Sequence, residues 1–305
     1  MLERTIPRGY KGQRGSWVAL AGAALVVAGG LAIYRRPFET VRSALRLGLR
    51  LRGVSERTVE VDGLPVRCLE AGRDGPGRKT LVLVHGLGGS AADWSFVMPR
   101  LSRNYRVLAL DLPGFGDTPA PPEGMSFSAL ERYLGGFLDR LGVERAALTG
   151  NSLGGAVVIR HAARNPERAE RLFLLDSAGL LYDAPPELEP RNREQARELT
   201  RLVTGEPDRT PGFVLDGMVR RAADPDRRAY LRSAEPTDVK DDLPRIQSPV
   251  TIIWGERDRL IPPDHGERMH AALRDSELIM LGDVGHIPQL QAPREVVRLV
   301  NERLS

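Results

Sequence analysis

Short runs in which every residue is apolar recur along the chain from about residue 80 onward, separated by helical or longer polar stretches. Strands covered on both faces show such runs, whereas strands with one wet face alternate apolar and polar residues. The pattern therefore predicts a mostly parallel sheet with helices on both sides, a doubly wound α/β architecture. The expected strands are Leu81–Val84, Val107–Leu110, Arg145–Thr149, Leu172–Leu175, Val250–Trp254 and Leu278–Leu281.

A hairpin pattern opens the body of the chain, because residues 58–61 and 64–70 are strand-like and flank the turn pair Asp62-Gly63. The alternation stops between residues 180 and 243, where prolines separate short helical pieces rich in Arg and Glu. We expect one domain with a core of residues 58–179 and 244–305. Residues 180–243 are predicted to form a helical lid over the strand ends, with its arginines on a solvated outer face.

The charge of the chain is unevenly distributed. Residues 1–57 hold 11 Lys and Arg against 3 Asp and Glu, a net charge of +8, and residues 58–305 carry a net charge of −4. The basic excess is therefore confined to the N-terminus. This argues against a nucleic-acid-binding body and favours a segment that meets anionic lipid headgroups.

An uncharged stretch at residues 15–34 has Trp17 and Tyr34 near its ends, where amphipathic rings favour a membrane interface. As a helix it would be roughly 30 Å long, the thickness of one hydrocarbon core. We predict a single-pass N-terminal transmembrane anchor within residues 1–57. A cleaved signal peptide is the alternative, although residues 34–37 make a poor cleavage site.

A basic amphipathic helix is predicted after this span. Its apolar positions at helical spacing are Phe38, Val41, Leu45 and Leu49, and Arg42, Arg46, Arg50 and Arg52 occupy other faces. Such a helix lies on a membrane surface or, as the alternative, is a connector packed on the domain. Six arginines follow the span and four basic residues precede it, which by the positive-inside rule favours a cytoplasmic catalytic domain.

The pentapeptide Gly150-Asn151-Ser152-Leu153-Gly154 stands between a strand-like run and a helical stretch, Leu153–Arg164. A serine between two glycines at this spacing suits a sharp turn from strand to helix that exposes the hydroxyl. Ser152 is therefore the candidate nucleophile, and it needs a histidine base. His286 follows the last apolar run and would reach the carboxyl edge of the sheet. The other histidines, at less suitable positions, are His85, His161, His265 and His270.

The histidine needs an acid, and the order of this motif places that acid between nucleophile and base. Asp258 follows Val250–Trp254 directly, with Glu256 as a near rival and Asp176 as a distant one. Backbone N–H groups of Leu153 and Leu87 are the candidates for stabilising an oxyanion, because Leu87 lies in a glycine-rich loop after an early strand. That loop lacks the phosphate-binding glycine motifs.

The chain resembles the α/β-hydrolase fold family from about residue 58 to its end. Further marks of this resemblance are the loop 111–117, Asp-Leu-Pro-Gly-Phe-Gly-Asp, and Trp254-Gly255 before the acid. The resemblance implies a Ser-His-Asp hydrolase, and it is closest to membrane-anchored monoacylglycerol-lipase-like enzymes. Carbon–carbon bond hydrolases of aromatic ring degradation are a second resemblance, but they usually carry a proline where this chain has Gly88-Gly89-Ser90.

These observations together predict a membrane-anchored carboxylic-ester hydrolase that acts on a small-molecule or lipid-like ester. We expect no nucleic-acid partner, no metal and no organic cofactor, since no cluster of residues has ligand spacing. Cys68, the single cysteine, permits no intramolecular disulfide. A carbon–carbon bond or thioester hydrolase of the same fold is the first alternative, and an inactive membrane-bound binding protein is the second.

Overall fold

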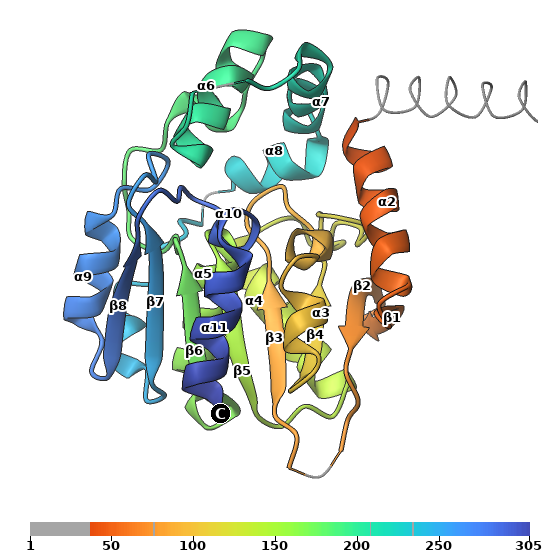
Figure 1. The fold of residues 1–305 in the computed structure, drawn as a ribbon, viewed down its shortest axis with the longest axis vertical. Helices are drawn as coiled ribbons and strands as arrows, with labels where there is room; N and C mark the ends of the chain where they lie inside the picture. Colours follow the sequence, from red (N-terminus) through yellow and green to blue (C-terminus); the bar gives the residue numbers. More distant parts are fainter. Residues whose placement is uncertain (1–36, 76, 208, 234) are drawn as a thin grey trace, which may run out of the picture.

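The computed structural model describes residues 37–305, except residues 76, 208 and 234. In this part of the chain, eight strands form one twisted sheet (Figure 1). In chain order they are β1 Ser55–Val61, β2 Leu64–Ala71, β3 Thr80–Val84, β4 Arg106–Leu110, β5 Ala146–Asn151, β6 Ala169–Leu175, β7 Val250–Gly255 and β8 Ser276–Leu281. Their spatial order is β1-β2-β4-β3-β5-β6-β7-β8, with β2 antiparallel to both neighbours and β3 to β8 parallel. The predicted mostly parallel sheet is confirmed.

The central strands explain the apolar runs in the sequence. Every residue of β3, β4, β5 and β7 is buried, whereas five of the six residues of the edge strand β8 are only partly buried. Two apolar clusters lie on the two faces of the sheet. Burial on both faces removes the need for polar alternation, so the sheet acts as a rigid platform for the loops at its carboxyl edge.

Helices cover both faces of the sheet (Figure 1). The first apolar cluster contains side chains of α4 Phe127–Arg140, α5 Leu153–Arg164 and α9 Asp264–Ala272. The second contains side chains of α3 Met98–Leu101, α11 Pro293–Leu304 and the 3₁₀ helix η1 Ala91–Trp94. Shorter elements are α10 Pro288–Gln291 and the 3₁₀ helices η2 Pro166–Arg168 and η4 Leu243–Arg245.

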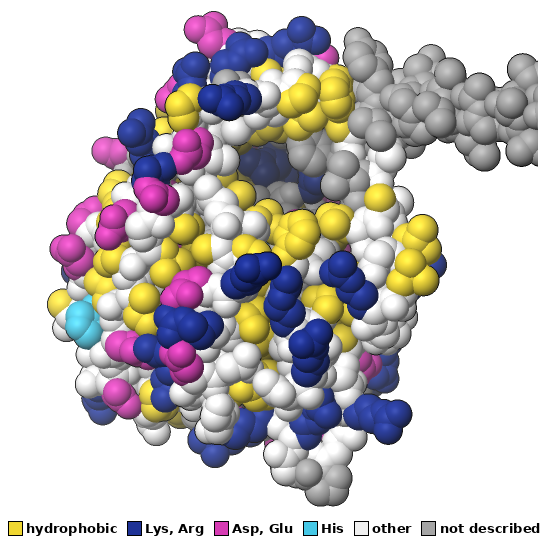
Figure 2. All heavy atoms as spheres, in the orientation of Figure 1, with side chains coloured by type: hydrophobic (Ala, Val, Ile, Leu, Met, Phe, Trp, Pro, Cys, Tyr) yellow, Lys and Arg dark blue, Asp and Glu magenta, His cyan; other side chains and the backbone are white. Residues whose placement is uncertain are grey.

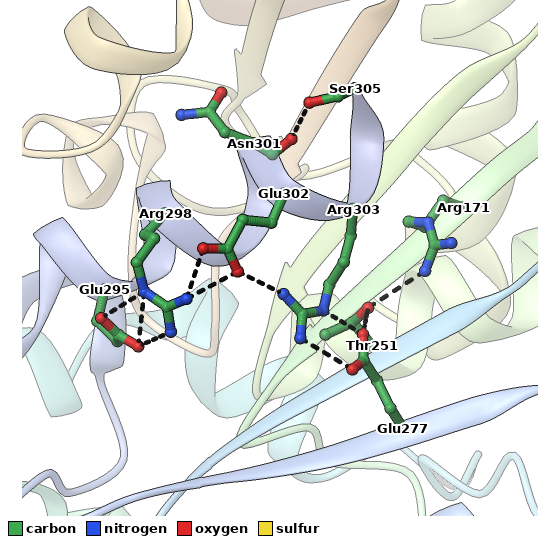
Figure 3. Close-up of polar contacts among 9 residues, drawn as sticks. All are labelled: Arg171, Thr251, Glu277, Glu295, Arg298, Asn301, Glu302, Arg303 and Ser305. Atoms are coloured by element: carbon green, nitrogen blue, oxygen red, sulfur yellow. Dashed lines mark hydrogen bonds and ion pairs between the residues drawn. The ribbon is translucent and has the colours of Figure 1, made fainter.

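Ion pairs connect the C-terminal helix α11 to the sheet (Figure 3). Arg303 bonds to Glu277 of β8, and Glu277 also accepts a 2.9 Å hydrogen bond from Thr251 of β7. On the exposed side of the helix, Arg298 binds both Glu295 and Glu302. The hydrogen bond from Arg303 lowers the pKa of Glu277. Because these pairs are partly solvated, each adds little stability, and the buried apolar face of α11 dominates its attachment.

The predicted lid contains η3 Pro186–Leu188, α6 Arg193–Thr204, α7 Gly212–Ala222 and α8 Pro225–Leu231, and no strand among its described residues. Figure 1 shows α6, α7 and α8 grouped beyond one end of the sheet. Figure 2 shows a hollow between these helices and the body, and basic side chains are visible inside it.

The helix predicted after the N-terminal span is present as α2 Pro37–Arg50. Leu49 is 2% exposed in the second apolar cluster, and Arg46 forms an ion pair with Asp117. The helix is therefore packed on the body, as in the connector alternative, while Leu47 remains 60% exposed. The predicted transmembrane span at residues 15–34 lies outside the described residues. Within residues 37–305, apart from the three gaps, no helix has the length and apolar character needed to cross a membrane.

Candidate active site

Ser152 occupies the turn between β5 and α5 with φ 53° and ψ −121°, a conformation that is strained for a residue with a side chain. Glycines on both sides make the turn possible. A Cβ at Gly150 would overlap the backbone of Gly154, and a Cβ at Gly154 would overlap the carbonyl of Val84 in β3. The turn therefore needs both glycines, and it places the serine side chain at the carboxyl edge of the sheet.

His286 and Asp258 form a direct hydrogen bond in the interior. His286 Nδ1 lies 2.7 Å from Asp258 Oδ2, and both residues are buried. The other carboxylate oxygen, Oδ1, accepts hydrogen bonds from the backbone N–H groups of Leu260 at 2.8 Å and Ile261 at 3.0 Å. These amides fix the orientation of the carboxylate, which in turn holds the proton of His286 on Nδ1 and leaves Nε2 free to act as a base.

Ser152 and His286 line the same cavity, which has a volume of about 460 Å³. No hydrogen bond joins the Ser152 hydroxyl to His286 among the described residues, a common state of such pairs before substrate binds. Asn151, which precedes Ser152 in the chain, ties this turn to the loop of His286. Its side-chain amide donates a hydrogen bond to the backbone carbonyl of His286 at 3.0 Å. Its oxygen accepts from Gln289 at 3.1 Å. Sequence reasoning gave Asn151 no role, since nothing local identifies its distant partners.

The loop that carries Leu87 approaches the nucleophile closely. A Cβ on Gly86 would lie 3.1 Å from Cβ of Ser152, and Leu87 and Leu153 line the cavity beside that serine. His85 fixes this loop from behind, because its Nε2 accepts a hydrogen bond from the Leu112 amide at 3.0 Å and its Nδ1 lies 2.8 Å from the Gly86 carbonyl. Both ring nitrogens are thus occupied, and His85 holds the loop in place.

The remaining sequence candidates lie elsewhere. Glu256, the near rival for the acid, is exposed. His161 lies 3.0 Å from Glu131 within the core, and His270 contacts Ser276 at the surface. His265 packs edge-on against Tyr182. Among the proposed acids in the described part of the chain, only Asp258 forms a hydrogen bond with His286.

Asp176, the distant rival for the acid, lies beside Asp258 and is fully buried. Its Oδ1 accepts the Gly255 amide at 2.9 Å, whereas no donor reaches its Oδ2. Burial and the neighbouring Asp258 charge raise the pKa of Asp176 well above its ordinary value. Asp176 therefore favours its neutral, protonated form beside Asp258. Asp176, Asp258 and His286 could also offer ligand atoms to a cation, but hydrogen bonds already occupy both oxygens of Asp258.

Substituting Asp176 by asparagine is expected to make the protein less sensitive to rising pH. The raised pKa means that folded Asp176 keeps a proton that the unfolded chain releases above about pH 4, so stability falls as pH increases. Asparagine keeps one acceptor and one N–H donor without titrating. Urea unfolding should show the variant gaining stability relative to the wild type as the pH rises above about 4. A difference that is the same at every pH would contradict the protonated state.

The predicted lid forms much of the cavity wall. Its apolar contributors include Leu188, Leu199, Val203 and Leu231, and Leu260, Ile261 and Leu290 of the core lie in the same wall. The end of α6 also contacts the loops of the acid and the base. Leu202 O accepts the Arg259 amide at 3.1 Å, and Val203 O accepts the His286 amide at 2.7 Å. Movement of α6 would therefore disturb both loops.

Arg227 departs from the prediction that the arginines of the lid are solvated. It lines the substrate-sized cavity, and its Nη2 donates to the carbonyl of Leu188 at 2.6 Å. Tertiary packing brings it inward from α8, a placement that the composition of the lid does not indicate.

Comparison with known proteins agrees with the observed fold. A model described as "Alpha/beta hydrolase family" matches residues 81–299. The uncharacterized hydrolase YugF of Bacillus subtilis is 30% identical over 249 residues, covering 75% of this chain and 90% of the relative. The 2-hydroxy-6-oxo-2,4-heptadienoate hydrolase of Pseudomonas putida is 31% identical over 274 residues, covering 82% and 96%. A solved structure of a membrane phospholipase A, described as a bacterial virulence factor, is 29% identical, with a TM-score of 0.78 and coverage of 93% and 97%. The chain therefore belongs to the alpha/beta hydrolase family and is an enzyme of the hydrolase class.

Proposed function

We propose that this hydrolase cleaves carboxylic esters of lipid-like alcohols or acids through a covalent acyl-enzyme. The observation that carries the proposal is the placement of Ser152 in one mainly apolar cavity with His286, which Asp258 orients at 2.7 Å. The cavity of about 460 Å³ is large enough for a medium-sized ligand and offers a hydrophobic wall to an acyl chain.

The proposed reaction begins when Ser152 Oγ attacks the ester carbon and His286 Nε2 takes the serine proton. The carbonyl oxygen becomes an anion, which the amides of Leu87 and Leu153 stabilise. His286 then gives its proton to the leaving alcohol oxygen, and the acyl group remains on Ser152. Water, deprotonated by His286, releases the acid and restores the serine. Asp258 stays ionised throughout and stabilises the imidazolium.

Two relatives indicate different substrates for this machinery. The phospholipase A structure supports a lipid ester, as does the predicted membrane anchor at residues 15–34, which would hold the cavity near lipid. The Pseudomonas putida relative, a 2-hydroxy-6-oxo-2,4-heptadienoate hydrolase, favours carbon–carbon bond cleavage as the second candidate. We place the lipid ester first because the lid side chains and the core together make a mainly apolar wall.

A chain-length series tests the lipid-like part of the proposal. With p-nitrophenyl esters kept below their aggregation limits, kcat/KM is expected to rise from acetate to octanoate, by up to about 0.8 kcal/mol for each buried CH₂, or roughly threefold to fourfold. Replacing Leu199 in the cavity wall by asparagine should flatten this series, while the exposed Leu51→Asn variant should preserve it. Equal rates for all chain lengths, combined with turnover of a dienoate, would instead support the carbon–carbon bond hydrolase.

A further inference from the structure

Arg227 lies between two cavities, next to the loop that contains Gly88. It lines the apolar cavity of Ser152 and also a smaller polar cavity of about 170 Å³. A Cβ on Gly88 would overlap Arg227 Nη1, so the guanidinium lies directly against the loop residue next to Leu87. Arg221 donates to the carbonyl of the same glycine and also lines the smaller cavity. Two guanidinium groups are thus gathered beside the candidate oxyanion site.

The positive charge of Arg227 is poorly compensated by the protein. Its hydrogen bond goes to the neutral carbonyl of Leu188, its Nε is buried with no partner, and no ion pair joins it to a carboxylate among the described residues. Burial and the neighbouring Arg221 lower the pKa of Arg227 to about 10. A partly buried charge without an ion-pair partner is costly, so a site of this kind favours an anionic ligand.

Glu189 and Asp224 lie near enough to favour the charge on Arg227, but neither forms an ion pair with it within the described part of the chain. Asp224 lines the smaller cavity, but its Oδ1 accepts the amides of Asp226 and Arg227 at the start of α8. Glu39, the other acid of that cavity, is exposed. The hydrogen bond from Arg227 to the Leu188 carbonyl would suffice if Arg227 only held the lid in place. A residue with that role alone does not require a guanidinium whose buried Nε has no hydrogen-bond partner.

We propose that Arg227, assisted by Arg221, binds the phosphate of an anionic ester lipid whose acyl chain occupies the apolar cavity of Ser152. The proposal rests on the ester hydrolase function and narrows its substrate class to monoacyl lipids with a phosphate a few bonds from the scissile ester. Gly88 is adjacent to Leu87, so an ester carbonyl at the oxyanion site places a neighbouring phosphate within reach of the guanidinium. Arginine suits this group because its planar fork can donate two parallel hydrogen bonds to phosphate oxygens.

Binding to the full chain with Ser152→Ala tests the proposal independently of catalysis. The probes are monohexanoylglycerol and monohexanoylglycerol phosphate below their aggregation limits, with inorganic phosphate as a third ligand, measured by calorimetry. We expect the phosphorylated lipid to bind roughly tenfold to a hundredfold more tightly than the neutral one. In the Ser152→Ala background, Arg227→Gln should remove this preference for the phosphorylated lipid, and Arg227→Lys should retain part of it. Arg228→Gln also removes one positive charge, but outside both cavities, and should leave the preference intact.

Three results would overturn the proposal. Equal binding of the two lipids to the Ser152→Ala protein would show that no anion subsite exists. If Arg227→Gln weakened the binding of both lipids equally and lowered the melting temperature, Arg227 would have only a structural role in holding the lid. Binding of inorganic phosphate that depends on Arg227, without preference for the phosphorylated lipid, would assign the site to a free anion. Hydrolysis of neutral esters by the wild type is measured separately, so each result leaves the ester hydrolase function to be judged by itself.

Discussion

Replacing Ser152 by alanine is expected to lower kcat for p-nitrophenyl butyrate by roughly 10⁵- to 10⁶-fold. The reason is that alanine has no nucleophile at the strained turn, and the remaining amides and cavity supply only a small part of the rate enhancement. Steady-state release of p-nitrophenol measures the change. Ser102→Ala, at the end of α3 and outside the cavity, is the matched control and should keep wild-type activity. A Ser152→Ala protein of undiminished activity would contradict the proposed mechanism.

Asp258→Asn should lower kcat by about 10⁴-fold without unfolding the protein. The carboxylate accepts the Nδ1 proton of His286, whereas an asparagine amide directed at Nδ1 would favour the tautomer with its proton on Nε2. His286 could then no longer accept the proton of Ser152.

Glu256→Gln is the control for this substitution, because it removes a carboxylate two residues away that is exposed. Kinetics of both variants at pH 7 to 8, with circular dichroism to verify folding, measure the contrast. The reverse pattern, with Glu256→Gln inactive and Asp258→Asn active, would transfer the role of the acid to Glu256.

The sequence was sufficient to predict the sheet and to select the residues of the site. Each predicted strand overlaps an observed one, because strands buried on both faces leave an unbroken apolar signature. Ser152, Asp258 and His286 could be selected because each lies in the turn or loop that follows a strand, and parallel strands bring these positions to one edge. The observed geometry is compatible with the proposed roles, which activity measurements have to test.

Contacts between residues that are far apart in the chain could not be predicted from the sequence. Asp176 could be chosen as a strand-end acid, but its pairing with Asp258 depends on β6 and β7 lying side by side. Asn151 reaches the carbonyl of His286, which is 135 positions away. No local pattern reports such a contact.

The surroundings of two basic segments, α2 and α8, could not be predicted from the sequence either. Charge and periodicity correctly predicted a helix near Leu49, but whether its arginines meet lipid or protein depends on acidic partners such as Asp117 in a distant loop. Arg227 was expected on the outer face because arginine-rich helices are usually solvated. The inward position of its side chain follows from how α8 packs against the Gly88 loop, and the composition of the lid does not indicate that packing.

The most direct test of the central claim is covalent labelling of the full chain by a fluorophosphonate, followed by peptide mass spectrometry. The proposed mechanism predicts one adduct per chain, on the peptide that contains Ser152, with labelling that slows strongly in His286→Ala because the hydroxyl loses its base. Labelling of another residue, or an unlabelled Ser152 in a folded protein that still hydrolyses esters, would contradict the claim that Ser152 is the nucleophile.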